Sequence, residues 1–293
     1  KGDHAKVKLD KPPFKPVEPK NSEENSEFAT LLNEIKPVQI KPRFVDFKKD
    51  VLSEDIGENI HFHYVKNPIN TIFSLKLQYG LGTIENSSLS QASQFISLLG
   101  TKEKTFNDFK EELQKIGSKI ETYSNSNYFG FNVSGFDSYF NQTLELLNEF
   151  ISTMHIREND KEKLNKLIEN SKITRDRELK DPATAGRALR DYVMYGKKSP
   201  YLRRSTLNEV QKMTPEFLIE QVKKAMKYEV DILYTGTINK QEVINYINST
   251  LDISSNLIKT SSPITIDYKK YSRNTVYLID DPKAVQSQIY IMT

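Results

Sequence analysis

The 293-residue sequence contains no cysteine. The chain therefore has no disulfide, no thiolate ligand for a metal ion and no cysteine nucleophile. It also lacks any run near the ~18 apolar residues that a membrane-spanning helix needs. Residues 1–19 lack the apolar region of a signal peptide. These absences predict no membrane span, and they leave the compartment open because a secreted protein of this size can do without disulfides.

Neither sign of charge is in large excess, with 42 Lys and Arg against 39 Asp and Glu. The charges are mixed along the chain without a basic stripe, so the sequence predicts no nucleic-acid partner. Fifteen Tyr and fifteen Phe exclude a wholly disordered chain. The length is sufficient for one large domain or two smaller ones.

Composition divides the chain into four parts. Residues 1–27 are predicted to be an extended interdomain linker, because the first twenty include six Lys and four Pro. Residues 28–251 carry the periodic patterns of a folded domain, and the serine-rich residues 252–275 are predicted to be a second linker. The apolar runs in residues 276–293 predict the first strands of a following, truncated domain. We therefore expect the sequence to be a piece of a longer protein.

Two periodicities alternate along the folded part. Alternation of apolar and polar residues predicts strands at 60–65, 73–79, 119–124, 129–133 and 230–234. Helical spacing predicts helices at 89–99, 106–116, 137–153, 159–179, 183–195, 214–225 and 239–249. Thr105 is expected to cap one helix, and Gly100 and Gly117 are expected to end two. Strand pairs separated by helix pairs predict an α+β fold, with a mostly antiparallel sheet covered on one face by helices.

Residue chemistry alone supplies no catalytic set. His61 and His63 are two apart on a predicted strand and so point to the same face, where such a pair can bind a metal. No third ligand is near them in sequence. Their alternation with Ile60 and Phe62 is explained equally by two polar positions on the outer face of an edge strand, which we favour. The sequence has neither a glycine-rich phosphate loop nor a G-x-S-x-G nucleophile elbow.

One segment has a distinctive order of features. Gly80 ends a strand, the helix containing Gln91-Ala-Ser-Gln-Phe95 runs to Gly100-Thr101, and the next helix ends at Gly117. This order resembles the core of the pitrilysin/insulysin family of zinc metallopeptidases, the inverzincins, whose first helix bears H-x-x-E-H. Further matches are Asn67-Pro68, Asp181-Pro182, Tyr195-Gly196, Ser199-Pro200-Tyr201, Thr214-Pro215-Glu216 and Tyr234-Thr-Gly236. The resemblance covers about residues 43–251 and implies a half-domain of the pitrilysin or mitochondrial processing peptidase type.

The sequence departs from this family at the metal-binding positions. By the resemblance, Gln91, Gln94 and Phe95 stand where the family has a histidine, the catalytic glutamate and the second histidine. The third zinc ligand would fall at about Lys172. Catalytic zinc usually takes three protein ligands with imidazole, thiolate or carboxylate donors. An amide cannot serve as the general base for a zinc-bound water. We therefore expect no catalytic residue, metal site or cofactor site in this chain, and no activity of the chain alone.

The resemblance implies a function for such a degenerate domain. The chain would be the non-catalytic, C-terminal half of a zinc-dependent metalloendopeptidase from a long bacterial member of the family. It would pair with a zinc-bearing half, on the same protein or on a homologous subunit, and help to enclose unfolded peptides. Zinc is expected in that catalytic half, and the bacterial periplasm is the favoured but unassigned compartment. The alternative is a stand-alone, non-enzymatic binding or scaffolding module with the same fold.

Overall fold

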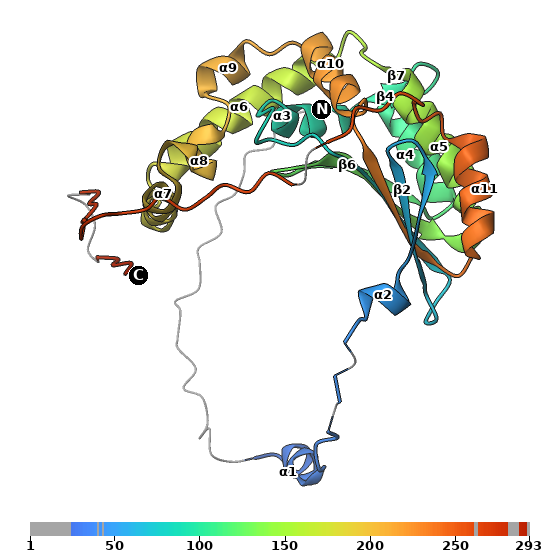
Figure 1. The fold of residues 1–293 in the computed structure, drawn as a ribbon, viewed down its shortest axis with the longest axis horizontal. Coiled ribbons are helices and arrows are strands. Elements are labelled where there is room, and N and C mark those ends of the chain that lie inside the picture. Colours follow the sequence, from blue (N-terminus) through green and yellow to red (C-terminus); the bar gives the residue numbers. More distant parts are fainter. Residues whose placement is uncertain (1–24, 40, 43, 261–262, 281–286, 292–293) are drawn as a thin grey trace, which may run out of the picture. The chain divides into compact units, whose positions relative to one another are not determined.

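The computed structural model in Figure 1 describes residues 25–39, 41–42, 44–260, 263–280 and 287–291. The chain divides into two units, and the boundary in the sequence falls between Val45 and Asp46. In the first unit, the described residues form the helix α1 (Glu27–Glu34), which has no buried side chain. Most of the predicted N-terminal linker, residues 1–24, lies outside the described residues.

The second unit holds the remaining elements. Its strands in the described residues are β1 (Leu52–Gly57), β2 (Ile60–Lys66), β3 (Ile72–Tyr79), β4 (Gly100–Thr101), β5 (Lys119–Ser124), β6 (Phe129–Phe136), β7 (Met154–His155) and β8 (Val230–Gly236). Its α-helices there are α2 (Phe47–Asp50), α3 (Leu89–Ile96), α4 (Phe106–Lys115), α5 (Phe140–Thr153), α6 (Asp160–Glu178), α7 (Pro182–Tyr195), α8 (Pro200–Arg203), α9 (Leu207–Gln211), α10 (Pro215–Ala225) and α11 (Lys240–Thr250). None of the helices in the described part of the chain has the length and hydrophobicity that crossing a bilayer requires.

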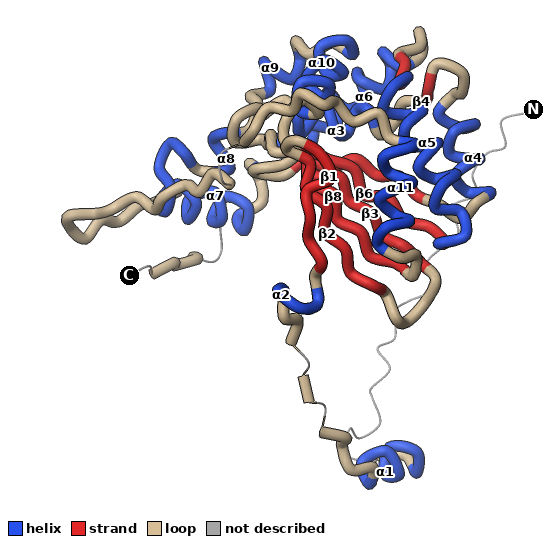
Figure 2. The backbone as a smooth tube through the Cα atoms, turned by 45° about the vertical axis from the view of Figure 1, so that its right-hand side comes forward, coloured by secondary structure: helices blue, strands red, loops and turns tan. Residues whose placement is uncertain are grey.

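The main sheet has six strands in the order β1-β2-β8-β3-β6-β5. Every neighbouring pair is antiparallel except β2 and β8, which run parallel. Helices α4, α5 and α11 lie over one face, and α3, α6 and α10 gather at one end of the sheet (Figure 2). The predicted α+β class, with a mostly antiparallel sheet and helices on one face, is confirmed.

Strand alternation separates an apolar face from a polar one. Phe62, Ile232 and Leu77 lie side by side on β2, β8 and β3, and all three are fully buried. Phe140 of α5 packs edge-on against Phe73 and Tyr234, with ring centroids 4.9 and 5.3 Å apart. Each such buried side chain stabilises the fold by ~1.5–3 kcal/mol relative to an exposed one. Polar side chains occupy the opposite face.

The strand order corrects one expectation from the sequence. We predicted that His61 and His63 lie on an edge strand, but β2 has β1 on one side and β8 on the other. Two features produce the difference. Strand β1 was not predicted, because its side chains are exposed or half-buried and give a weak apolar signal. Strand β8, about 170 residues away in sequence, inserts between β2 and β3.

Most predicted helix ends agree with the structure, with one exception. Gly117 follows α4 with φ +64°, and the peptide nitrogen of Ser118 donates to the carbonyl of Leu113, as in a glycine-terminated helix. Gly100 does not end α3, which stops at Ile96. Gly100 instead starts β4 and pairs with His155 of β7. A Cβ at position 100 would lie 2.2 Å from the carbonyl oxygen of Lys104, so close backbone approach explains this glycine.

The residues after α11 are partly bound to the domain. Segment 252–260 has no helix or strand, Leu257 is buried, and Ile258 forms a parallel bridge with Tyr228. Asn59 donates to the carbonyl of Leu257 over 2.9 Å. The described residues 276–280 and 287–291 form no strand, although the sequence predicts strands there. A strand needs a partner for its backbone groups, and no described segment pairs with them.

Helix α4 offers a test of the local interactions. Thr105 and Asp108 form a capping box, in which each side chain accepts a hydrogen bond from the other's backbone nitrogen. We expect Thr105→Ala to lower the free energy of unfolding in urea by ~1 kcal/mol. The backbone nitrogen of Asp108 loses its acceptor, and the Asp108 carboxylate, which accepts from the backbone nitrogen of residue 105, loses its hydrogen bond to the Thr105 hydroxyl. Thr105→Ser keeps the hydroxyl and should retain most of the stability. Equal losses in the two variants would contradict this role of the cap.

Candidate functional site

Helix α3, which the sequence resemblance sets against the family's zinc helix, lies beside β5 and α10. The hydroxyl of Thr122 on β5 donates to the carbonyl of Ser93 over 2.6 Å, which fixes the helix against this strand. Gln91 and Gln94 line a pocket of about 590 Å³ on one side of α3. Phe95 is fully buried in the core. The structure therefore brings two of the predicted motif positions to the pocket and turns the third into the domain interior.

Helix α6 forms the opposite wall of this pocket. Its lining residues recur at helical spacing and are Leu167, Asn170, Ser171, Thr174, Arg175 and Glu178. Lys172, the approximate position of the family's third zinc ligand, is exposed and lies outside this lining. The correspondence of Lys172, Gln91, Gln94 and Phe95 with the family's motif positions stays a prediction. The pocket places Ser171 and Arg175, each within a few residues of Lys172, across from α3.

Arginines dominate the charge of the pocket lining. Arg175, Arg203 and Arg204 line it together with a single carboxylate, Glu178. Both oxygens of Glu178 are bound by Arg204, over 2.8 and 3.0 Å. This bidentate hydrogen bond, with the charge of Arg204, holds the pKa of Glu178 below its ordinary value against the opposing effect of burial. Sequence analysis missed these arginines, because they follow Gln91 by about 84 to 113 positions and belong to no motif.

The side chains at this site do not suit zinc. The lining offers amide, hydroxyl and guanidinium groups and a carboxylate already paired with arginine, in place of the imidazole and free carboxylate donors that zinc takes. Across the described residues, no group of three or more His, Asp or Glu side chains is arranged to hold a metal ion. The pocket also has no carboxylate or imidazole free to act as a general base.

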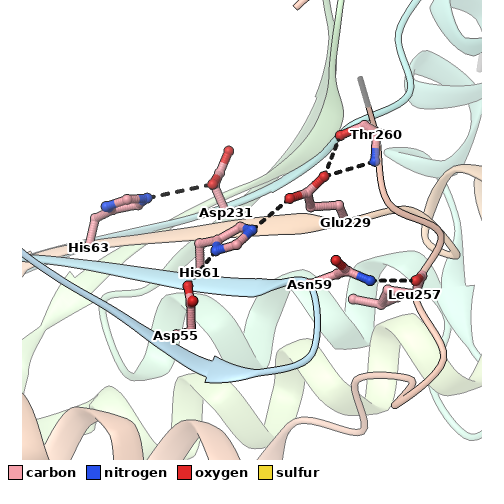
Figure 3. Close-up of polar contacts among 8 residues, drawn as sticks. All are labelled: Asp55, Asn59, His61, His63, Glu229, Asp231, Leu257 and Thr260. Atoms are coloured by element: carbon pink, nitrogen blue, oxygen red, sulfur yellow. Dashed lines mark hydrogen bonds and ion pairs between the residues drawn. The ribbon is translucent and has the colours of Figure 1, made fainter. Parts of the chain in front are cut away.

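The two histidines of β2 lie on the polar face of the sheet among acidic side chains (Figure 3). His61 contacts Asp55 through Nδ1 and Glu229 through Nε2, both over 2.6 Å. Glu229 also accepts hydrogen bonds from the backbone nitrogen and the hydroxyl of Thr260, over 2.8 and 2.7 Å. His63 Nε2 lies 3.5 Å from Asp231. Each imidazole is therefore bound to carboxylates of its own, and the two do not converge on a common centre.

Charge pairing in this cluster shifts two pKa values in opposite directions. The hydrogen bonds to Asp55 and then Glu229 raise the pKa of His61 above 6.5, against a smaller opposing effect of burial. Burial raises the pKa of Glu229, but hydrogen bonds from Thr260 and His61 outweigh it and leave the pKa below 4.5. The cluster thus ties the segment that follows α11 to the sheet through the Glu229 carboxylate, which also contacts His61.

Sequence comparison identifies the class of domain. Residues 89–184, from the start of α3 into α7, match the family model of insulinase, Peptidase family M16. No curated protein matches the chain in sequence.

Solved structures share the fold at low sequence identity. One is the inactive domain of a peptidase M16 from Pseudomonas fluorescens, at 13% identity and TM-score 0.58, which covers 73% of this chain and 54% of that chain. Another is the first half of the periplasmic protease PqqL from Escherichia coli, at 13% identity and TM-score 0.58, which covers 75% and 49%. A third is a mutant of the ferredoxin protease FusC in complex with Arabidopsis ferredoxin, at 9% identity and TM-score 0.63, which covers 80% and 28%.

These findings confirm the predicted resemblance to the pitrilysin/insulysin-type peptidases. The chain has the fold of an M16 peptidase half, and its neighbours include a domain described as inactive. It spans about half or less of the length of these three structures.

The histidine cluster generates a pH-dependent prediction. Asp55→Asn should lower the pKa of His61 toward 6.5, measured from imidazole chemical shifts in an NMR titration, because the neutral amide removes the first of two carboxylate partners. Because the folded-state pKa of His61 is raised, its stabilising contribution is complete below pH 6.5 and is lost as the pH rises through the folded-state value. The stabilising contribution of Glu229 is present above pH 4.5 and is lost as the pH falls through the lowered pKa of this residue.

Glu54→Gln is the matched control for this titration. Glu54 also lies on β1, but its carboxylate pairs with Lys240 over 3.0 Å. This change should leave the pKa of His61 nearly unaltered. An unshifted His61 in Asp55→Asn, or an equal shift in both variants, would contradict the pairing in Figure 3.

Proposed function

We propose that this chain is the non-catalytic half of a zinc-dependent metalloendopeptidase. In this proposal it pairs with a zinc-bearing half, on the same protein or on a homologous subunit, and forms part of the wall of a chamber that encloses unfolded peptides. The zinc-bearing half carries out peptide-bond hydrolysis. The observation that carries the proposal is a peptidase M16 fold in which α3, the helix that the resemblance sets against the family's zinc helix, presents Gln91 and Gln94 to a polar pocket.

The chemistry of the pocket supports a non-catalytic role. A hydrolytic zinc site needs three suitable ligands and a base for the attacking water. Here the two motif positions that line the pocket are amides and the third is a buried phenyl ring, so the helix supplies none of these groups. The lining has three arginines and several amides and hydroxyls that suit peptide groups. Such a surface contributes to substrate binding without taking part in bond cleavage.

The polar face of the sheet supports a role in lining an aqueous space. His61, Asp231 and Gln78 lie side by side across β2, β8 and β3 on the face opposite the helices. Lys76 lies over the ring of Tyr123 on the same face, 4.7 Å from its centroid. A sheet face with half-buried polar side chains is suited to a hydrated interior or to a partner domain.

Reconstitution with the zinc-bearing half tests this function. When this chain is added to the separately purified zinc half, the rate of hydrolysis of an unfolded fluorogenic peptide should rise by about tenfold or more, and a chelator should abolish it. The chain alone should show no hydrolysis. Gln91→Ala together with Gln94→Ala in this chain should leave kcat within about twofold, because amides provide no base or metal ligand.

The same experiment separates the proposal from its alternative. Full activity of the zinc half alone, with no association between the two chains by analytical ultracentrifugation, would favour a stand-alone binding or scaffolding module. An H-x-x-E-H helix encoded upstream of Lys1 in the same reading frame would place the two halves on one protein.

A further inference from the structure

Among the described residues, the lining of the pocket beside α3 carries more positive than negative charge. Its only lining carboxylate, Glu178, is bound on both oxygens by Arg204. Neither Arg175 nor Arg203 has a carboxylate within ion-pair distance among the described residues. Two guanidinium groups without an ion-pair partner among the described residues therefore line a cavity of about 590 Å³, and Glu178 interacts with the charge of Arg175 only at longer range.

Both of these arginines are held in place by backbone carbonyls. Nη2 of Arg175 donates to the carbonyl of Ser205 over 3.0 Å. Nε of Arg203 donates to the carbonyl of Lys198 over 2.9 Å. A guanidinium has five N–H donors, so each retains several for a ligand after its single bond to the protein. Burial lowers the pKa of Arg203, which indicates a guanidinium partly removed from water.

Gln91, which lines the same pocket, carries a polar atom that has no partner among the described residues. Its Oε1 is buried and has no hydrogen-bond partner, although a buried amide oxygen normally has one. The other pocket-lining amide of α3, Gln94, donates through Nε2 to the carbonyl of Ser90 in its own helix, over 3.0 Å. The buried end of the Gln91 amide is thus a second position at which a bound ligand satisfies a group that the fold leaves open.

These groups match the chemistry of a peptide that carries a carboxylate. We propose that the pocket between α3, α6 and α8 binds a peptide carboxylate through Arg175 and Arg203, and the adjacent peptide amide through Gln91. Arginine forms paired, charge-assisted hydrogen bonds to a carboxylate, and these are stronger in a partly desolvated site than in water. An amide N–H supplies the donor that Gln91 Oε1 lacks.

The proposal rests on the proposed function only in taking a peptide as the molecule that carries the carboxylate. The site would retain acidic segments of unfolded substrates at the position where the catalytic half of the family holds zinc. The carboxylate has two possible sources, an Asp or Glu side chain and the C-terminus of the peptide. The pocket recognises the group common to both.

Fluorescence anisotropy with this chain alone tests the site. A short fluorescein-labelled peptide with capped termini and one central Glu is compared with the same peptide carrying Gln. We expect the Glu peptide to bind at least about tenfold more tightly, a difference that diminishes as salt is added. A second pair of peptides has no acidic residue and differs only at the C-terminus, which is a free carboxylate in one peptide and an amide in the other. This pair tests the C-terminus as the source of the carboxylate. A preference for the free acid there equally supports the site.

Substitutions in the chain locate the binding. Arg203→Gln, on the short helix α8, and separately Arg175→Gln should abolish the preference for the carboxylate peptide. Arg177→Gln is the matched control, because it removes the same charge from the same helix as Arg175 but at an exposed position outside the pocket lining. Circular dichroism and thermal melting identify any variant that fails to fold. If one of the two pocket variants does not fold, the peptide preference of the other one tests the proposal.

Three results would overturn the proposal. They are equal binding of the Glu and Gln peptides with no preference for a free C-terminus, no saturable binding of any peptide, and an equal loss of affinity in Arg177→Gln and Arg203→Gln. Because no zinc-bearing half is present, these results leave the hydrolysis experiment unaffected, so failure of the pocket and failure of the proposed function are distinguishable.

Discussion

The position of β8 is the constraint on which the rest of the structure depends. Without this strand, β1-β2 and β3-β6-β5 are two separate antiparallel pieces of sheet. β8 joins them by pairing parallel with β2 and antiparallel with β3, and it buries Ile232 and Tyr234 between their apolar side chains. The β2–β8 pair closes a loop of about 170 residues, so its entropic cost must be offset by this burial. Contacts at such long separation are formed slowly and make the fold strongly cooperative.

The same strand assembles the polar face of the domain. Glu229 and Asp231 at the start of β8 lie beside His61 and His63 because the two strands are in parallel register. Glu229 in turn holds Thr260, so the segment that leaves α11 is fixed to the sheet by side chains that titrate. A pair of histidines that the sequence offers as a possible metal site is instead part of an ion-pair cluster. The same carboxylate, Glu229, therefore contacts both a strand of the sheet and the segment in which the chain continues after α11.

The pocket beside α3 combines residues from several helices into one polar cavity. The fold places α3 and α6 on two sides of a pocket. Its lining has amide groups on α3 and guanidinium groups on α6 and near α8, which favour binding of anionic peptide groups over metal coordination. The pocket and the polar face of the sheet provide two hydrophilic surfaces on one rigid core.

The sequence by itself determined the local structure, because the period of the apolar residues follows directly from strand and helix geometry. It predicted β5 at residues 119–124 and the Thr105 cap. Only the tertiary structure decided that β8 lies between β2 and β3, and that Phe95 points into the core. It also decided that Arg175 and Arg203 face Gln91. Periodicity specifies which face of an element is buried, whereas its neighbours are chosen by packing between residues that are far apart in the chain.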